Sequence, residues 1–176
     1  VFAASLNKPL KPSQLFNVLI DVLNHPLPRT SARQESLATS EFDPMMGSRL
    51  PLSILLAEDN PTNQKLATHL LSRLGYNVEL AGNGLEALEA LQNRIFDVIL
   101  MDVQMPELDG LTATRQIRKN QNGVAVPYII AMTANAMEGD RETCLASGMN
   151  DYVSKPIRVQ SLVTALTNAA AFLQEH

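Results

Sequence analysis

The stretch F-D-V-I-L-M-D-V-Q-M-P-E-L-D-G, residues 96–110, decides the fold of this chain. Its apolar residues 98–101 form a short continuous run, which is typical of a β-strand covered on both faces. The run ends at Asp102, and the breakers Pro106 and Asp109-Gly110 follow before a helical pattern begins. A carboxylate at the end of a buried parallel strand lies at the rim where open α/β sheets bind ligands. Asp102 is therefore a candidate site residue, although a lone Asp could equally end the strand or cap a helix.

Strand-like and helix-like segments alternate on both sides of this stretch. The strands are expected at 54–57, 77–80, 97–101, 127–132 and 151–154. The first helix is expected between Asn60-Pro61 and Gly75, with an apolar stripe of Leu66, Leu70, Leu71 and Leu74. The other helices are expected over 85–93, 111–122, 137–147 and 159–172. This alternation predicts an α/β domain with a parallel sheet covered by helices on both faces. Its strand count suits a doubly wound, flavodoxin-like (βα)5 sheet with the strand order 2-1-3-4-5.

The composition is ordinary for a soluble globular protein, with 176 residues, 45% hydrophobic and 18% charged. A net charge of −4 and the lack of a Lys/Arg cluster argue against a nucleic-acid surface. No apolar run approaches the roughly 20 residues that span a bilayer, so we expect no membrane contact by this chain. The single Cys144 cannot form an internal disulfide, which favours a reducing, cytoplasmic compartment.

Four of the expected strands end in residues suited to phosphate or metal chemistry: Glu58 and Asp59, Asp102, Thr133, and Lys155. Strand ends of this kind lie side by side in a doubly wound sheet. Three neighbouring carboxylates repel one another unless a cation binds among them, and hard oxygen ligands favour Mg²⁺. The Lys155 ammonium and the Thr133 hydroxyl can hold an anionic group that is transferred onto a carboxylate. Each residue alone has a structural explanation, so the prediction rests on their convergence.

Residues 52–173 resemble the receiver domain of two-component response regulators and hybrid sensor histidine kinases. The motifs that carry the resemblance are L-L-A-E-D-N, V-I-L-M-D-V-Q-M-P-E-L-D-G, I-I-A-M-T-A-N-A and D-Y-V-S-K-P-I. The resemblance implies a receiver domain over residues 51–174 that works in a phosphorelay. In such a relay Asp102 would accept a phosphoryl group from the phosphohistidine of a histidine kinase or a histidine phosphotransfer domain.

The same resemblance implies a set of Mg²⁺ ligands. Asp59 and Asp102 would bind the ion together with the backbone carbonyl of Gln104, and Glu58 would act mostly through water. Many family members have Asp where this chain has Glu58, which is a mild departure.

The resemblance also implies a switch. Thr133 and Lys155 would hold the phosphoryl group, and Tyr152 would be the aromatic residue that swings inward on activation. The Lys155-Pro156 peptide bond is expected to be cis. Gln104 and Asn135 occupy the positions that tune how fast the acyl phosphate hydrolyses in this family.

Other interpretations of the residues fit less well. A cofactor-binding flavodoxin relative needs a phosphate-cradling loop after the first strand, where Glu58 and Asp59 would repel phosphate. A haloacid-dehalogenase-type phosphatase would need a second acid at position 104, where this chain has Gln104. A pseudo-receiver scaffold would usually lack one of the five site residues, and none is lacking. A kinase core is not expected, because neither ATP-lid glycines nor a histidine box is found.

The first part of the chain repeats the last part. Residues 8–15, K-P-L-K-P-S-Q-L, align with residues 155–162, K-P-I-R-V-Q-S-L, and Leu19 then aligns with Leu166. Residues 1–23 therefore resemble the last strand and helix of an upstream receiver domain. Residues 24–50, rich in Pro, Ser and Thr, are interpreted as a linker in which Met45-Met46 is incidental.

Tandem receivers indicate a parent protein that is a hybrid histidine kinase or, alternatively, a multi-receiver response regulator. A membrane anchor in such a parent is compatible with a cytoplasmic receiver. An apolar stripe in the upstream segment, Leu15, Val18, Leu19 and Val22, is expected to dock in cis or through a homodimer.

Overall fold

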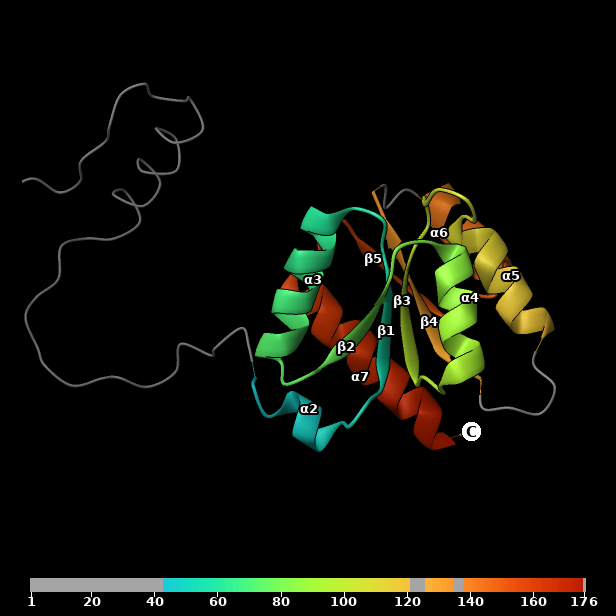
Figure 1. Cartoon of the computed structure of the whole chain (residues 1–176). Coiled ribbons are helices and arrows are strands. Elements are labelled where there is room, and N and C mark those ends of the chain that lie inside the picture. The colour runs from blue at the N-terminus through green and yellow to red at the C-terminus, as the bar shows by residue number, and fades with distance from the viewer. Residues whose placement is uncertain (1–42, 121–125, 135–137, 176) are drawn as a thin grey trace, which may run out of the picture. The chain divides into compact units, whose positions relative to one another are not determined.

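The computed structural model describes residues 43–120, 126–134 and 138–175. They contain a parallel sheet of five strands in the order β2-β1-β3-β4-β5 (Figure 1). The strands are β1 (Ile54–Ala57), β2 (Val78–Ala81), β3 (Val98–Asp102), β4 (Tyr128–Thr133) and β5 (Asp151–Ser154). The predicted fold class and strand order are therefore confirmed, with strand ends that differ from the expected ones by about one residue.

Helices cover both faces of the sheet (Figure 1). On one face lie α2 (Met46–Arg49), α3 (Pro61–Arg73) and α7 (Val159–Glu175). On the other lie α4 (Gly84–Asn93), α5 (Gly110–Lys119) and α6 (Glu138–Ala146). None of the helices that the structure describes combines the length and the apolar character needed to cross a membrane.

Two hydrophobic cores, one on each face, explain the continuous apolar runs of the central strands. Leu56 and Leu100 pack with Leu71 of α3 and Leu166 of α7 on one face. The neighbouring side chains of the same strands point to the other face and pack against α4, α5 and α6. β1, β3 and β4 are buried along their whole length because both their faces are covered.

The start of α3 is set by local chemistry. The Asn60 side chain caps the helix and accepts a hydrogen bond from Thr62 N at 2.9 Å, and Pro61 takes the first helical position. Gly75, in the left-handed region with φ 89°, follows the helix end. These caps agree with the sequence prediction and fix how α3 leaves the carboxyl end of β1.

Leu66 differs from the predicted stripe of α3. It was expected on the buried face, but its side chain is 43% exposed. The buried stripe consists of Ala67, Leu70, Leu71 and Leu74, which follow the i, i+3, i+4, i+7 spacing. Leu66 precedes that stripe by one residue, and one residue is about 100° of helix rotation.

The segment before β1 also differs from its interpretation as a linker. Residues 43–50 include α2, whose Met46 is 3% exposed and packs in the core beside α3 and α7. The Tyr76 hydroxyl donates a hydrogen bond to the Leu50 carbonyl at 2.9 Å. The described part of this segment is thus packed on the domain. Met46 is a core residue, but the sequence around it shows no helical periodicity because α2 is only one turn long.

Candidate functional site

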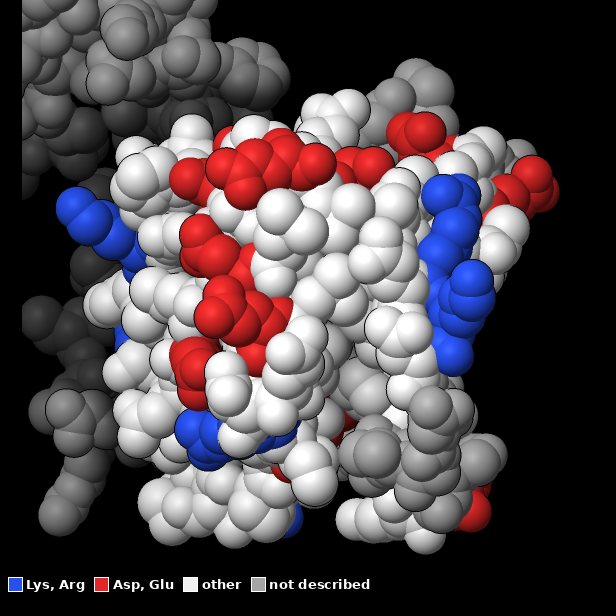
Figure 2. Space-filling view, turned by 45° about the vertical axis from the view of Figure 1, so that its right-hand side comes forward, with Lys and Arg blue, Asp and Glu red and all other residues white. Residues whose placement is uncertain are grey.

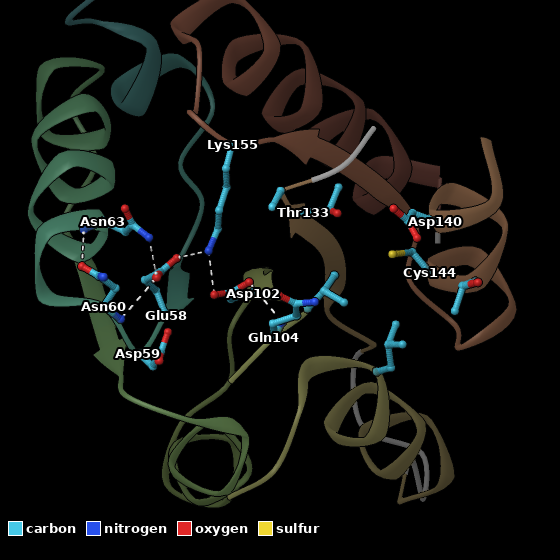
Figure 3. A pocket seen from close by; sticks show the side chains of 14 residues that line it. Glu58, Asp59, Asn60, Asn63, Asp102, Gln104, Thr133, Asp140, Cys144 and Lys155 are labelled. Carbon is cyan, nitrogen blue, oxygen red and sulfur yellow. Dashed lines mark hydrogen bonds and ion pairs between the residues drawn. The ribbon is translucent and has the colours of Figure 1, made fainter. Parts of the chain in front are cut away.

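The predicted site residues converge at the carboxyl ends of the strands. Glu58 and Asp59 follow β1, Asp102 ends β3, Thr133 ends β4, and Lys155 follows β5. All five line a cavity of about 550 Å³ (Figure 3). Strand pairing brings these five side chains together at one edge of the sheet, because β3 pairs with both β1 and β4, and β4 pairs with β5.

Lys155 bridges two of the carboxylates. Its Nζ lies 2.6 Å from Asp102 Oδ2 and 2.6 Å from Glu58 Oε2 (Figure 3). Burial alone would lower the pKa of Lys155, but hydrogen bonds to Asp102 and Glu58 and their negative charges raise it above its ordinary value. The ammonium group is therefore charged at neutral pH and fixed beside Asp102.

Asp102 is nearly enclosed, at 5% exposure. Burial raises the pKa of its carboxyl, and the Lys155 hydrogen bond and the Gln104 N–H oppose that rise. Gln104 N donates to Asp102 Oδ1 at 3.2 Å, while Lys155 Nζ donates to Asp102 Oδ2. The two carboxylate oxygens thus have different surroundings, one beside a backbone N–H and the other beside a cation.

The loop after β3 is held close to the acid by Gly110. Gly110 N donates to the Val103 carbonyl at 3.1 Å, and a Cβ at position 110 would lie 2.0 Å from the Asp102 carbonyl oxygen. Only a residue without a side chain fits this approach. The D-G pair that the sequence presents as a turn signal thus also seats α5 against the end of β3.

Glu58 is held on both of its oxygens. It is 1% exposed, and its Oε1 accepts from Asn60 N at 3.2 Å and from Asn63 Nδ2 at 2.9 Å. Gln64 Nε2 donates to the Glu58 carbonyl at 2.6 Å. Neither Asn63 nor Gln64 was predicted from the sequence as a site residue. The Asn60-Pro61 cap predicts that α3 begins directly after Glu58, but it does not predict that these two side chains turn back toward Glu58.

The acidic group has the character of a metal site. Glu58, Asp59 and Asp102 each present a carboxylate oxygen, and these atoms lie within 4.8 Å of one another. Asp59 is exposed, whereas the other two acids are buried. Acidic side chains also gather along the upper edge of the molecule in Figure 2, the edge at which the carboxyl ends of the strands lie in Figure 1. A hard divalent cation fits this all-oxygen donor set.

Thr133 and Tyr152 lie in different surroundings. Thr133 is 7% exposed and lines the cavity, and its carbonyl accepts a hydrogen bond from Lys155 N at 2.7 Å. Tyr152 is partly buried on β5, with the Arg141 guanidinium 5.7 Å from its ring centre. It does not line the cavity that holds Asp102, and lines a groove between β5 and α7.

The remaining predicted features are the two modulating residues, Gln104 and Asn135, and the Lys155-Pro156 peptide bond. Gln104 is exposed and lines the cavity, while Asn135 lies outside the described residues. The Lys155-Pro156 peptide bond is cis. Beyond Thr133, the cavity continues to a wall of residues that were not predicted from the sequence: Leu111, Asp140, Thr143 and Cys144.

Comparison with known proteins identifies the family. The profile described as response regulator receiver domain matches residues 54–167. This chain belongs to the response regulator receiver domain family. The matched range runs from β1 into α7 and includes every site residue named above.

Three relatives illustrate the receiver domain similarity. The chain is 44% identical over 129 residues to hybrid signal transduction histidine kinase H of Dictyostelium discoideum, which covers 71% of this chain and 9% of that protein. It is 47% identical to the receiver domain of sensor histidine kinase PA1611 from Pseudomonas aeruginosa, crystallised with magnesium coordinated in the active-site cleft. That similarity has a TM-score of 0.62 and covers 68% of this chain and 98% of the other.

The third relative is the receiver domain of the response regulator Ssk1 from Saccharomyces cerevisiae, crystallised with the histidine phosphotransfer protein Ypd1. It is 31% identical, with a TM-score of 0.65, and the similarity covers 69% of this chain and 90% of that one. The chain spans only 9% to 16% of the length of the first curated relatives that it matches. Those relatives are therefore much longer proteins in which a receiver domain is one part.

Proposed function

We propose that this receiver domain accepts a phosphoryl group onto Asp102 from a phosphohistidine and so carries signals in a two-component phosphorelay. The observation that carries the proposal is the position of Asp102. It is a buried carboxylate at the end of β3, 2.6 Å from the Lys155 ammonium and beside two further acids. A carboxylate so placed is a nucleophile next to a fixed positive charge that can stabilise a transferred anion.

The chemical step exchanges one bond to phosphorus for another. An Asp102 carboxylate oxygen forms a P–O bond while the P–N bond of the phosphohistidine breaks, and the imidazole keeps that electron pair and then takes a proton. The product is an aspartyl phosphate. Lys155 would pair with a phosphoryl oxygen, and the Thr133 hydroxyl would donate to the same group.

Mg²⁺ is the proposed cofactor. Asp59, Asp102 and the Gln104 carbonyl would hold the ion, with Glu58 acting mostly through water. The relative crystallised with magnesium in its cleft and the 4.8 Å cluster of carboxylate oxygens in this chain support that assignment. When bound, the ion would neutralise charge on the carboxylates and on the phosphoryl oxygens.

The switch and the modulating positions follow the same proposal. Movement of Thr133 toward the new phosphoryl oxygens would free space for Tyr152, so that α6, β5 and α7 change together. Gln104 would influence the lifetime of the acyl phosphate from the rim of the cavity, as would Asn135.

The proposed partner is a histidine kinase or a histidine phosphotransfer domain, in the cytoplasm. The receiver of Ssk1, which was crystallised with a phosphotransfer protein, supports the second. The proposed parent is a hybrid histidine kinase, supported by the Dictyostelium relative, with a multi-receiver regulator as the alternative. Residues 1–23 would be the end of an upstream receiver and 24–50 a connecting segment, whose last part, from residue 43, packs on the domain.

Labelling tests the proposal directly. Incubation with a small phosphodonor and Mg²⁺ should add one base-labile phosphoryl group, detected by intact-mass spectrometry. Asp102→Asn should abolish it. Asp151→Asn, which removes a carboxylate from β5 outside the cavity, should label like the parent chain. Equal labelling of Asp102→Asn would refute the assignment, and no labelling of the parent would favour a pseudo-receiver scaffold.

A further inference from the structure

The Glu58 carboxylate is oriented by the first turn of α3. In a capping box, an acidic side chain at the third helical position bonds the backbone N–H of the N-cap residue. Here Asn60 is the N-cap and Asn63 occupies that third position. The carboxylate that accepts from Asn60 N belongs instead to Glu58, and Asn63 donates its amide to the same oxygen, Oε1, at 2.9 Å.

This arrangement leaves the other oxygen for Lys155. Glu58 Oε2 lies 2.6 Å from Lys155 Nζ, and the same Nζ lies 2.6 Å from Asp102 Oδ2. A continuous series of polar contacts therefore links four side chains, in the order Asn63, Glu58, Lys155 and Asp102 (Figure 3). This series runs from an amide on α3 to the acid at the end of β3.

The Asn63 side chain is not needed to start its own helix. The Asn60 side chain already accepts from Thr62 N at 2.9 Å and from Asn63 N at 3.4 Å, and Pro61 fills the first helical position. Gln64, the next residue, donates from its side-chain amide to the backbone carbonyl of Glu58. Consecutive residues of α3 thus fix the side chain and the main chain of Glu58.

We propose that Asn63 is a positioning residue of the phosphoryl-transfer site. Asn63 holds the Glu58 carboxylate in place, and Glu58 in turn keeps the Lys155 ammonium beside Asp102. The inference rests on the proposed function for its catalytic consequence, but the contact itself can be tested without catalysis. A long lysine side chain loses considerable rotamer entropy when fixed, so its position depends on partners that are themselves rigid.

The decisive variant is Asn63→Asp, because Asp has nearly the same shape and replaces the amide donor by a second carboxylate. Repulsion between that carboxylate and Glu58 should turn Glu58 away from Lys155. We expect the labelling rate of Asp102 to fall on the order of tenfold, the usual size of effects on groups that orient a site. Asn63→Ala should give a smaller loss, since Asn60 N still bonds Glu58. Thr62→Ala, an exposed change on the same turn, is the control and should label at the parent rate.

Two readouts separate positioning from a merely structural role. The NMR signal of the Lys155 ammonium, recorded in the absence of phosphodonor, should broaden or shift in Asn63→Asp but not in Thr62→Ala. In a Glu58→Gln background, Asn63→Asp should change the labelling rate much less than it does in the parent, because the two residues act through one contact.

An unchanged labelling rate together with an unchanged Lys155 signal in Asn63→Asp would overturn the inference, as would equal effects in the two backgrounds. If Asn63→Asp unfolds the domain, the milder Asn63→Ala variant decides by the same two readouts. If the parent chain itself is not labelled on Asp102, the proposed function fails, whereas the Lys155 signal still tests whether Asn63 sets the position of the lysine.

Discussion

At the scale of single residues, the site holds one ammonium group between two buried carboxylates. Lys155 contacts Asp102 and Glu58 at 2.6 Å each, so that negative charge exceeds positive charge before Asp59 is counted. Buried charge without a full complement of partners is costly. This excess of negative charge therefore costs stability, and binding of the proposed cation would relieve it.

The first residue-scale prediction concerns Asp102→Asn. Burial raises the pKa of Asp102, so the folded state resists its ionisation. Below the ordinary carboxyl pKa both folded and unfolded states are protonated, and no cost arises; as pH rises through the raised pKa the cost develops fully. Asp102→Asn should thus be more stable than the parent at pH 7, and this gain should shrink toward pH 3. Lys155 keeps Glu58 as its partner in the variant.

Urea unfolding in metal-free buffer across that pH range measures the difference. Asp151→Asn serves as the matched control and should show no gain at pH 7. A destabilised Asp102→Asn at neutral pH would mean that the Lys155–Asp102 ion pair outweighs the cost of burying the carboxylate.

The second residue-scale prediction concerns Mg²⁺. An ion that binds the folded state alone stabilises it, by about 1.4 kcal/mol at ten times its Kd. Thermal unfolding with and without Mg²⁺ should show this shift in the parent, and Asp59→Asn should lose most of it. Glu107→Gln, an exposed acid on the loop after β3, should keep it. Equal shifts for Asp59→Asn and the parent would exclude Asp59 as a ligand.

Strand ends explain which site residues could be predicted from sequence. Asp102 and Thr133 end apolar runs, and Lys155 follows the short strand-like segment Asp151–Ser154. Topology alone brings those strand ends together. Asn63 carries no such signal, because an Asn in the first helical turn is common for capping reasons. Its role depends on the direction in which α3 leaves β1, which only the three-dimensional arrangement gives.

At the scale of elements, α2 is the feature that periodicity could not predict. Its single turn is anchored by a close approach of two glycines: Gly47 N donates to the Leu74 carbonyl at 2.8 Å, and a Cβ at position 47 would lie 2.3 Å from the Gly75 carbonyl oxygen. Met46 then enters the core. The family profile begins at residue 54, so this anchored segment precedes the matched range.

The element-scale prediction follows from that close approach. Gly47→Ala places a methyl group against backbone that cannot move aside cheaply, so α2 should detach and withdraw Met46 from the core. We expect a loss of about 1–3 kcal/mol in the free energy of unfolding. Limited proteolysis should cleave near residues 43–53 faster than in the parent. Ser48→Ala, an exposed change in the same turn, is the control; a fully stable, uncleaved Gly47→Ala would show that the turn adapts without detaching.

At the scale of the whole molecule, the candidate site and the packed segment before β1 lie near different ends of the sheet. Asp102 and Lys155 lie at the carboxyl ends of the strands, whereas α2 precedes β1 and lies near the opposite end (Figure 1). The alternation of strands and helices was enough to predict this polarity, because parallel strands share one carboxyl edge. Sequence periodicity could not show that residues 43–50 pack on the domain, since a four-residue helix is shorter than the period that reveals a helix face.

The whole-molecule prediction concerns the apolar stripe of the upstream segment, which lies outside the described residues. Leu15, Val18, Leu19 and Val22 recur at helical spacing. Burying each large apolar side chain contributes about 1.5–3 kcal/mol, so exposure of the whole stripe should be disfavoured. We therefore expect it to dock on this domain or on a second copy. Deleting residues 1–40, which leaves α2 in place, should keep the labelling of Asp102 unchanged and alter the association state or solubility.

Light scattering at matched protein concentrations measures that association state. Leu15→Glu combined with Leu19→Glu should reproduce the effect of the deletion, because two charges on the stripe prevent its burial. Ser13→Glu combined with Asn17→Glu adds the same charge beside the stripe and should leave association unchanged. A deletion that abolished labelling would make the upstream segment part of the phosphoryl-transfer site. Identical behaviour of the stripe variant and its control would show that net charge, and not docking of the stripe, governs association.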